Sequence, residues 1–176
     1  MKWILTIAIS VIALSAEAQE TVLDVSKDKQ VSFESTLGSL SMVIFVDEDC
    51  PYDKKYISRI RDLQRAYTNV NLILISSNSD VNQAKKYLMG NQFSGEGLHD
   101  PKGLIRKRLG ARKSTEAFLL KKEGQSFSIL YQGAIDSNPI NDGSVRVTYL
   151  SNAILNVLNG DPVQKEKTIV AGCALK

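Results

Sequence analysis

The sequence predicts an α/β fold: a three-layer sandwich with a central mixed sheet of about four or five strands and helices on both faces. Three observations predict it. Apolar residues fill two runs, 41–46 and 71–76, as is typical of strands covered on both faces. Each run precedes a stretch with apolar residues at three- and four-residue spacing, which indicates an amphipathic helix. Two later strand-like runs, 117–120 and 127–131, flank a polar turn and indicate an antiparallel hairpin.

The first half of the chain alternates strand and helix. Residues 21–40 carry a weak apolar pattern, which predicts one or two short edge strands. After the first apolar run we expect a helix of about four turns at 52–67. After the second run, Ser79 or Asp80 can cap another helix, which Gly90 ends. Because strand–helix alternation favours right-handed crossovers, we expect these strands to pair in parallel.

Two further helices are expected in the second half. Asp100 is suited to an N-cap and Pro101 to the first helical position, which predicts a short helix ending near Leu109. A last helix is expected at 144–159, with Gly160 as its stop. The apolar residues of that helix are expected to be buried: Val147, Leu150, Ile154, Leu155 and Leu158.

The amino-terminal residues are typical of a signal peptide. A short basic start is followed by an apolar run too short to cross a bilayer, and a small-residue cleavage site ends at Ala18. We therefore expect a signal peptide at 1–18, one domain at 19–163 and a tail at 164–176 that carries Cys173. The protein is expected to be exported, to a bacterial periplasm or the medium, with no membrane span after cleavage.

Composition argues against several classes of function. The net charge of +3 is too small to indicate a nucleic-acid-binding protein, and no aromatic residues are interleaved with basic ones. Two cysteines and one histidine are too few for a structural zinc site. Phosphate-binding loops and the serine-hydrolase motif are also missing from the sequence. We expect no metal and no cofactor.

Cys50 is the strongest chemical signal. It follows a buried strand and is followed at once by Pro51 and a helix. A thiol at a helix N-terminus lies beside unpaired backbone N–H groups and the positive end of the helix dipole, which favour the thiolate. The competing interpretation is a small buried side chain without reactivity. Its position at the carboxyl end of a strand favours a reactive thiol.

Cys173 is the only other cysteine in the chain, so it is the only intramolecular partner for Cys50. The sequence leaves three states open: a reversible disulfide in which Cys173 resolves an intermediate on Cys50, a structural disulfide, or no bridge. The distance between the two α-carbons decides, since a disulfide needs them within roughly 7 Å.

Four short stretches carry a resemblance to a known family. They are Cys50-Pro51-Tyr52, residues 75–78, residues 131–136 and Gly172-Cys173. With them the chain resembles the peroxiredoxin-like, AhpC/TSA-type redoxins of the thioredoxin-like superfamily. The resemblance implies a thioredoxin-like fold and a thiol-dependent oxidoreductase or thiol peroxidase with antioxidant activity. Cys50 would then attack a peroxide or a disulfide, and Cys173 or an external thiol would resolve the product.

Two departures from that pattern limit the expected chemistry. Asp53 stands where a thioredoxin carries its second cysteine, so no local Cys-x-x-Cys disulfide can form. Val43 and Asp47 stand where typical peroxiredoxins carry proline and a hydroxyl residue. The hydroxyl that would position a peroxide is therefore missing.

The loop expected to face the substrate departs as well. Thr115 stands where thioredoxin-like proteins place a cis-proline, and a non-proline cis bond costs about 2.5–4 kcal/mol, so we expect a trans peptide. Arg112 and Lys113, with the helix that begins at Pro51, are expected to lower the pKa of Cys50. His99 is expected to be a surface turn residue.

The expected partners are a peroxide or disulfide substrate and a thiol reductant, for which a membrane-bound or exported thioredoxin-like protein is the candidate. No nucleic acid is expected. The alternative is a non-catalytic thioredoxin-fold binding or scaffolding module that works through the Thr115 loop and a basic helix face. That face comprises Lys54, Lys55, Arg59 and Arg61, which are otherwise expected to be solvated.

Overall fold

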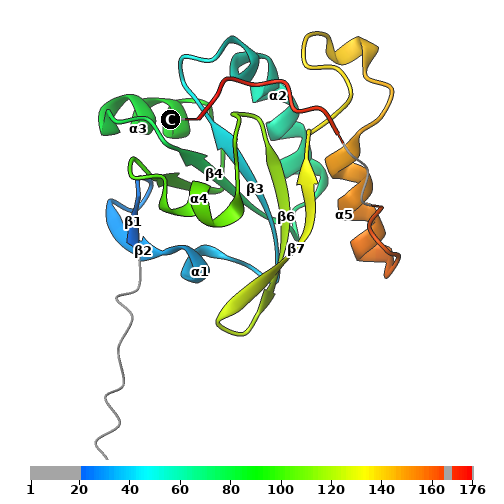
Figure 1. The fold of residues 1–176 in the computed structure, drawn as a ribbon, viewed down its shortest axis with the longest axis horizontal. Helices are drawn as coiled ribbons and strands as arrows, with labels where there is room; N and C mark the ends of the chain where they lie inside the picture. Colours follow the sequence, from blue (N-terminus) through cyan, green and yellow to red (C-terminus); the bar gives the residue numbers. More distant parts are fainter. Residues whose placement is uncertain (1–20, 165–167, 176) are drawn as a thin grey trace, which may run out of the picture.

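The computed structural model describes residues 21–164 and 168–175, and Figure 1 shows their arrangement. Within this part of the chain, one sheet of seven strands runs in the order β2-β1-β5-β4-β3-β6-β7. Its strands are β1 (Thr21–Asp24), β2 (Lys29–Ser32), β3 (Leu40–Val46), β4 (Asn71–Ser76), β5 (Glu96–His99), β6 (Ala117–Glu123) and β7 (Ser126–Gly133). The helices are α1 (Phe33–Thr36), α2 (Pro51–Ala66), α3 (Val81–Gly90), α4 (Leu104–Leu109), α5 (Tyr149–Asn159) and the 3₁₀ turn η1 (Asp142–Ser144).

The sheet is mixed, as expected. The central strands β3, β4 and β5 are parallel, and the outer pairings are antiparallel. Successive residues of a strand point to opposite faces, so β3 divides its side chains between two apolar cores. Met42 and Ile44 pack on the face covered by α2, α3 and α5, whereas Val43 and Phe45 pack on the face covered by α1 and α4. This is the predicted three-layer sandwich.

The sheet has seven strands rather than the four or five predicted. The strands β1 and β2 lie within residues 21–40, where one or two short edge strands were predicted; β2 is at the edge of the sheet and β1 lies between β2 and β5. No strand was predicted between Gly90 and Asp100, where β5 lies. Its sequence includes Gly97 and shows no alternation of apolar residues. Leu98 nevertheless is fully buried, because β5 pairs in parallel with β4. Tertiary pairing, rather than local preference, makes this segment a strand.

Helix α4 begins at Leu104, three residues later than predicted. Gly103 adopts a left-handed conformation (φ 64°), and Pro101 lies in the preceding turn. Asp100 still caps the helix from this greater distance, because its carboxylate accepts hydrogen bonds from the amides of Leu104 (2.7 Å) and Arg106 (3.1 Å).

Helix α5 is also shorter than predicted, because η1 and an extended segment replace its first turn. Leu150 and Ile154 are fully buried, as expected, and Ala153 lies between them on the same stripe. Leu155 and Leu158 were expected to be buried but are each 45% exposed. Leu155 follows Ile154 by one residue, or about 100° around the helix, and points away from the sheet; Leu158, about 40° beyond Ile154 in the last turn, lies at the edge of the buried stripe.

The predicted signal peptide, residues 1–18, lies outside the described residues. Among the residues that the structure describes, none of the helices has the length and apolar character needed to span a bilayer.

Candidate active site

Cys50 lies at the N-terminus of α2, where the sequence places it. It is the N-cap residue, Pro51 is the first helical residue, and only 1% of Cys50 is exposed. The preceding strand β3 ends four residues earlier, so the sulfur lies at the carboxyl end of the central parallel strands. In α/β sheets this edge is the usual position of functional sites.

A disulfide joins Cys50 to Cys173. Their α-carbons are 5.8 Å apart, although the two residues are separated by 123 positions in the sequence. Of the three states left open by the sequence, the structure thus contains a bridge. Figure 1 shows the path of the tail that carries Cys173: the carboxyl-terminal segment, in red, crosses the end of the sheet beside α2 and runs toward α3.

The tail pairs through its backbone with the loop that precedes β6. The amide of Ser114 donates to the carbonyl of Cys173 (2.8 Å), and the amide of Leu175 donates to the carbonyl of Arg112 (3.0 Å). These two bonds flank an isolated antiparallel bridge. The tail therefore docks as an extended segment against residues 112–115.

Side chains of the loop hold the tail as well. The Thr115 hydroxyl donates to the carbonyl of Ala171 (2.7 Å), and the Lys113 ammonium donates to the carbonyl of Val170 (3.0 Å). Thr115 has a left-handed backbone (φ 60°), which is uncommon for a β-branched residue. No peptide bond among the described residues is cis, so the predicted trans peptide before Thr115 is confirmed.

The amide of Cys173 faces the sulfur of Cys50. Its nitrogen lies 3.2 Å from Cys50 Sγ and 3.0 Å from the Ser114 hydroxyl oxygen. A backbone N–H at this distance would stabilise negative charge on the sulfur when the disulfide is broken. The tail thus supplies both a cysteine and a hydrogen-bond donor.

Gly172, next to the bridge, is in close contact with the loop. A Cβ atom at this position would lie 1.9 Å from the carbonyl oxygen of Ser114 and 2.7 Å from its carbonyl carbon. Any side chain at 172 therefore requires the backbone of the tail or of the loop to move.

Asp53 is the second titratable group of this site. It lies in the first turn of α2, is 1% exposed, and accepts a hydrogen bond from the amide of Asp47 (3.1 Å). Its Oδ2 atom has no well-formed hydrogen bond with any described residue, although the nearby Ser114 hydroxyl favours the ionised form. Burial dominates, with smaller contributions from the charges of Asp47 and Glu48, and raises the pKa of Asp53 to about 7.

The burial of Asp53 and its raised pKa were not predicted from the sequence. The sequence indicated only that Asp53 stands where a thioredoxin carries its second cysteine. A signal was present. Asp53, Tyr56, Ile60 and Leu63 lie at three- and four-residue spacing on the buried stripe of α2. A carboxyl on an apolar stripe predicts burial and a raised pKa.

Three comparisons with known proteins bear on this site. The profile of the AhpC/TSA family matches residues 12–149. The chain belongs to the AhpC/TSA family. A search of curated proteins found no match.

Solved structures share the fold of this AhpC/TSA-family chain. An uncharacterized conserved protein from Geobacillus kaustophilus has a TM-score of 0.77 and 20% identity, over 89% of this chain and 87% of that one. A hypothetical protein from Sinorhizobium meliloti 1021 has a TM-score of 0.74 and 20% identity, over 90% and 91%. A putative thiol:disulfide interchange protein DsbE from Chlorobium tepidum has a TM-score of 0.59 and 16% identity, over 79% and 92%. The thioredoxin-like fold expected from the resemblance is confirmed.

The other predicted site residues, Arg112 and Lys113, lie in the loop that contacts the tail. Lys113 contacts the tail carbonyl named above, and the Arg112 amide donates to Glu116 Oε2 (2.8 Å). Both residues are exposed. Their effect on the pKa of Cys50 stays a prediction.

Two expectations about polar residues are wrong. His99 is not a surface turn residue: it is in β5, is 7% exposed, and its Nε2 lies 2.7 Å from the carbonyl oxygen of Asn78. Arg59 is not solvated: its side chain is 11% exposed and pairs with Asp136 at 2.8 Å. Both corrections have the same cause, because the polar atoms find partners on segments distant in sequence.

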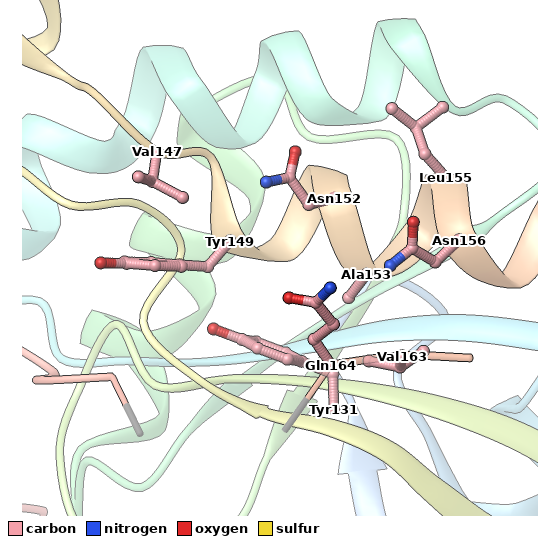
Figure 2. Close-up of a pocket in the computed structure, with 9 residues that line it drawn as sticks. All are labelled: Tyr131, Val147, Tyr149, Asn152, Ala153, Leu155, Asn156, Val163 and Gln164. Atoms are coloured by element: carbon pink, nitrogen blue, oxygen red, sulfur yellow. The ribbon is translucent and has the colours of Figure 1, made fainter. Parts of the chain in front are cut away.

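The family site is separate from the hollow shown in Figure 2. That hollow lies between α5, the end of β7 and the segment after α5, and its volume is about 270 Å³. Tyr131, Tyr149 and Gln164 contribute polar atoms to its lining. Neither cysteine is among the residues that line it.

Proposed function

We propose that this protein is an exported thiol–disulfide oxidoreductase in which Cys50 and Cys173 form a reversible disulfide. The observation that carries the proposal is the bridge itself, between a cysteine at the N-terminus of α2 and a cysteine on an extended tail. Membership in the AhpC/TSA family supports redox chemistry at Cys50. The thiol:disulfide interchange protein of similar fold is consistent with the same class of reaction.

In the proposed reaction, the reduced Cys50 thiolate attacks one sulfur of a substrate disulfide. A bond forms between Cys50 and that sulfur, and the other substrate sulfur leaves as a thiolate. The Cys173 thiolate then attacks Cys50 Sγ and releases the second substrate thiolate. The protein loses two electrons and the substrate disulfide becomes two thiols. A thiol reductant, for which a thioredoxin-like donor is the candidate, returns the protein to the dithiol state.

A disulfide substrate is favoured over a peroxide by the surroundings of Cys50. Asp47 occupies the position of the hydroxyl that would position a peroxide, and its amide is bound to the buried Asp53 carboxyl. Attack on a peroxide expels hydroxide and is assisted by the hydroxyl that positions the peroxide, which is missing here, whereas attack on a disulfide expels a thiolate and does not depend on that hydroxyl.

The test uses reduced protein and a disulfide-linked model peptide, with products identified by mass spectrometry. Wild-type protein should release peptide thiol and form the Cys50–Cys173 disulfide. Cys173→Ser should stop at the Cys50–peptide mixed disulfide, and Cys50→Ser should not react. A wild-type rate no higher than that of free cysteine would contradict the proposal and favour a non-catalytic binding module. Faster oxidation by hydrogen peroxide than by the peptide would identify a peroxidase instead.

Export is proposed from the residues of the amino terminus, which are typical of a signal peptide cut after Ala18. An oxidising compartment would also favour a cysteine pair of this kind. The measurement is the amino-terminal sequence of the protein recovered from cells and medium, which should begin at Gln19. Recovery of the chain with an uncut amino terminus would contradict export by this route.

A further inference from the structure

We propose that Cys50 and the loop 112–115 bind an extended partner segment in which glycine immediately precedes the reacting cysteine, and that residues 170–175 are the chain's own occupant of that site. The inference rests on the proposed function, because it names the segment with which Cys50 exchanges disulfides. It goes further in specifying the residue next to the substrate cysteine.

The first step is that the tail is held mainly by contacts to its backbone. The loop provides an amide donor at Ser114, a carbonyl acceptor at Arg112, and the side chains of Lys113 and Thr115, which donate to tail carbonyls. None of these contacts requires a particular tail side chain. Another extended segment can therefore make all of them once the tail leaves, as in recognition by addition of a strand.

The second step is that the backbone pairing between the tail and the loop 112–115 brings the cysteine of the bound segment next to Cys50. The N–H of residue 173 lies within hydrogen-bond distance of both Cys50 Sγ and the Ser114 hydroxyl oxygen, and the carbonyl of the same residue accepts from the Ser114 amide. A segment bound through these groups brings the sulfur of its own cysteine to Cys50. The tail thus shows the geometry of a mixed disulfide with a partner.

The third step is the exclusion of side chains before that cysteine. A Cβ atom at 172 would lie 1.9 Å from the Ser114 carbonyl oxygen, a contact with backbone rather than with a movable side chain. The Ser114 carbonyl is held from the side away from the tail, because the amide of the same peptide, that of Thr115, donates to the carbonyl of Phe45 in β3 (2.7 Å). A partner with a larger residue at this position must move off the loop and lose the flanking hydrogen bonds.

The order of events follows from the shared site. While the disulfide is intact, the tail occupies the surface formed by Cys50 and the loop 112–115, and Cys50 is 1% exposed. Reduction by the thiol donor removes the covalent tether, so the tail and a partner segment then compete for the same groups. After Cys50 has formed the mixed disulfide, the Cys173 thiolate returns with the tail, attacks Cys50 Sγ and displaces the partner's thiolate.

The experiment compares two peptides on reduced, full-length Cys173→Ser protein. One has the sequence of residues 170–175, and the other has alanine in place of its glycine; both are supplied as disulfide-linked dimers. The glycine peptide should form the mixed disulfide with Cys50 about tenfold faster, or more, the ratio that a loss of about 1.4 kcal/mol produces. The tail remains in both reactions, so its competition does not alter the ratio.

Two controls separate the inference from the proposed function. The rates of both peptides with free glutathione should be equal, which shows that the peptides have the same intrinsic reactivity. Equal rates with the protein would overturn the glycine selectivity while leaving disulfide exchange intact. No reaction with either peptide or with oxidised 2-mercaptoethanol would overturn both.

A second variant tests the occupant itself. Gly172→Ala in the full chain should weaken tail docking and lower the equilibrium constant for forming the Cys50–Cys173 disulfide in a glutathione buffer by about tenfold. The matched control is Gly90→Ala, since a Cβ at Gly90 meets nothing within 4 Å. An equilibrium constant for Gly172→Ala equal to that of the control would contradict the close contact on which the selectivity depends.

Discussion

At the scale of single residues, Asp53 is the buried carboxyl of the first turn of α2, which follows Cys50. It occupies the position of a second cysteine in Cys-x-x-Cys, but it is a carboxyl with 1% exposure. Tyr87, from α3, also feels its charge: burial and then the charge of Asp53 raise the pKa of Tyr87. The Tyr87 hydroxyl is buried and has no hydrogen-bond partner among the described residues. Two buried polar atoms, Asp53 Oδ2 and the Tyr87 hydroxyl, therefore lack hydrogen-bond partners among the described residues, which carries an energetic cost.

The raised pKa of Asp53 predicts a pH-dependent stability. Below about pH 4 the carboxyl is protonated in both the folded and unfolded states. Between about pH 4 and pH 7 the unfolded state ionises while the folded state keeps its proton, so the free energy of unfolding falls as pH rises. Above pH 7 the free energy of unfolding is lower than below pH 4 by at most about 4 kcal/mol, because the pKa differs by roughly three units at 1.36 kcal/mol each.

Asp53→Asn should remove this dependence. Urea unfolding of oxidised wild-type and variant protein from pH 4 to pH 8 measures it. The stability of the variant relative to wild type should rise by about 2–4 kcal/mol over that range, mostly before pH 7. Other titrating groups are common to both proteins and cancel. A difference that stays constant with pH would show that Asp53 titrates normally.

At the scale of elements, α2 carries two ion pairs with very different surroundings. Arg59 pairs with Asp136, and both side chains are nearly buried, at 11% and 6% exposure. The Tyr56 hydroxyl donates to the same carboxylate (3.1 Å), and the Arg59 guanidinium lies over the Tyr56 ring (4.6 Å). Asp62 and Arg65 form the second pair, at 65% and 74% exposure. The first pair joins α2 to the segment after β7; the second stays on the helix surface.

Removal of one partner should therefore have unequal effects. Asp136→Ala leaves the Arg59 charge buried without a partner and should lower the free energy of unfolding by about 3 kcal/mol. Asp62→Ala, the matched control on the exposed pair, should change it by less than about 1 kcal/mol. Urea unfolding at low salt measures both. Equal effects for the two variants would mean that the Arg59 pair is solvated in solution.

At the scale of the whole molecule, the disulfide closes a loop that contains every element from α2 to α5, whereas β1, β2, α1 and β3 precede it. The bridge spans 123 positions, from the start of α2 to the tail. In the chain-entropy account, a cross-link over a loop of this length stabilises the folded state by about 5 kcal/mol, because it restricts the unfolded chain. A reversible bridge would couple this stabilisation to the redox state of the protein.

The reduced protein should accordingly be less stable than the oxidised protein by about 3–5 kcal/mol. Urea unfolding with and without a reductant measures the difference. Cys50→Ala/Cys173→Ala should match reduced wild type and show no response to the reductant, which controls for effects on other groups. Equal stability of the oxidised and reduced proteins would indicate that the bridge offsets its entropy gain with strain in the folded state.

Much of the fold could be predicted from local patterns. The apolar runs at β3 and β4, the helical spacing of α2 and the hairpin turn before β7 depend on contacts that each segment makes repeatedly along its own length. The strand β5 and the start of α4 could not be predicted in this way. Parallel pairing with β4 makes β5 a strand, and the left-handed backbone of Gly103, which the residue pattern did not indicate, sets the start of α4.

The sequence by itself determined the α/β class, the position of Cys50 at a helix N-terminus and the limitation to one possible bridge, because these follow from order and spacing. Only the tertiary structure decided that the tail returns across the sheet, that Gly172 contacts the Ser114 carbonyl and that the Asp53 carboxyl is buried. The reason is physical. These features join groups more than fifty residues apart or depend on exclusion of water, and neither is encoded in a local pattern.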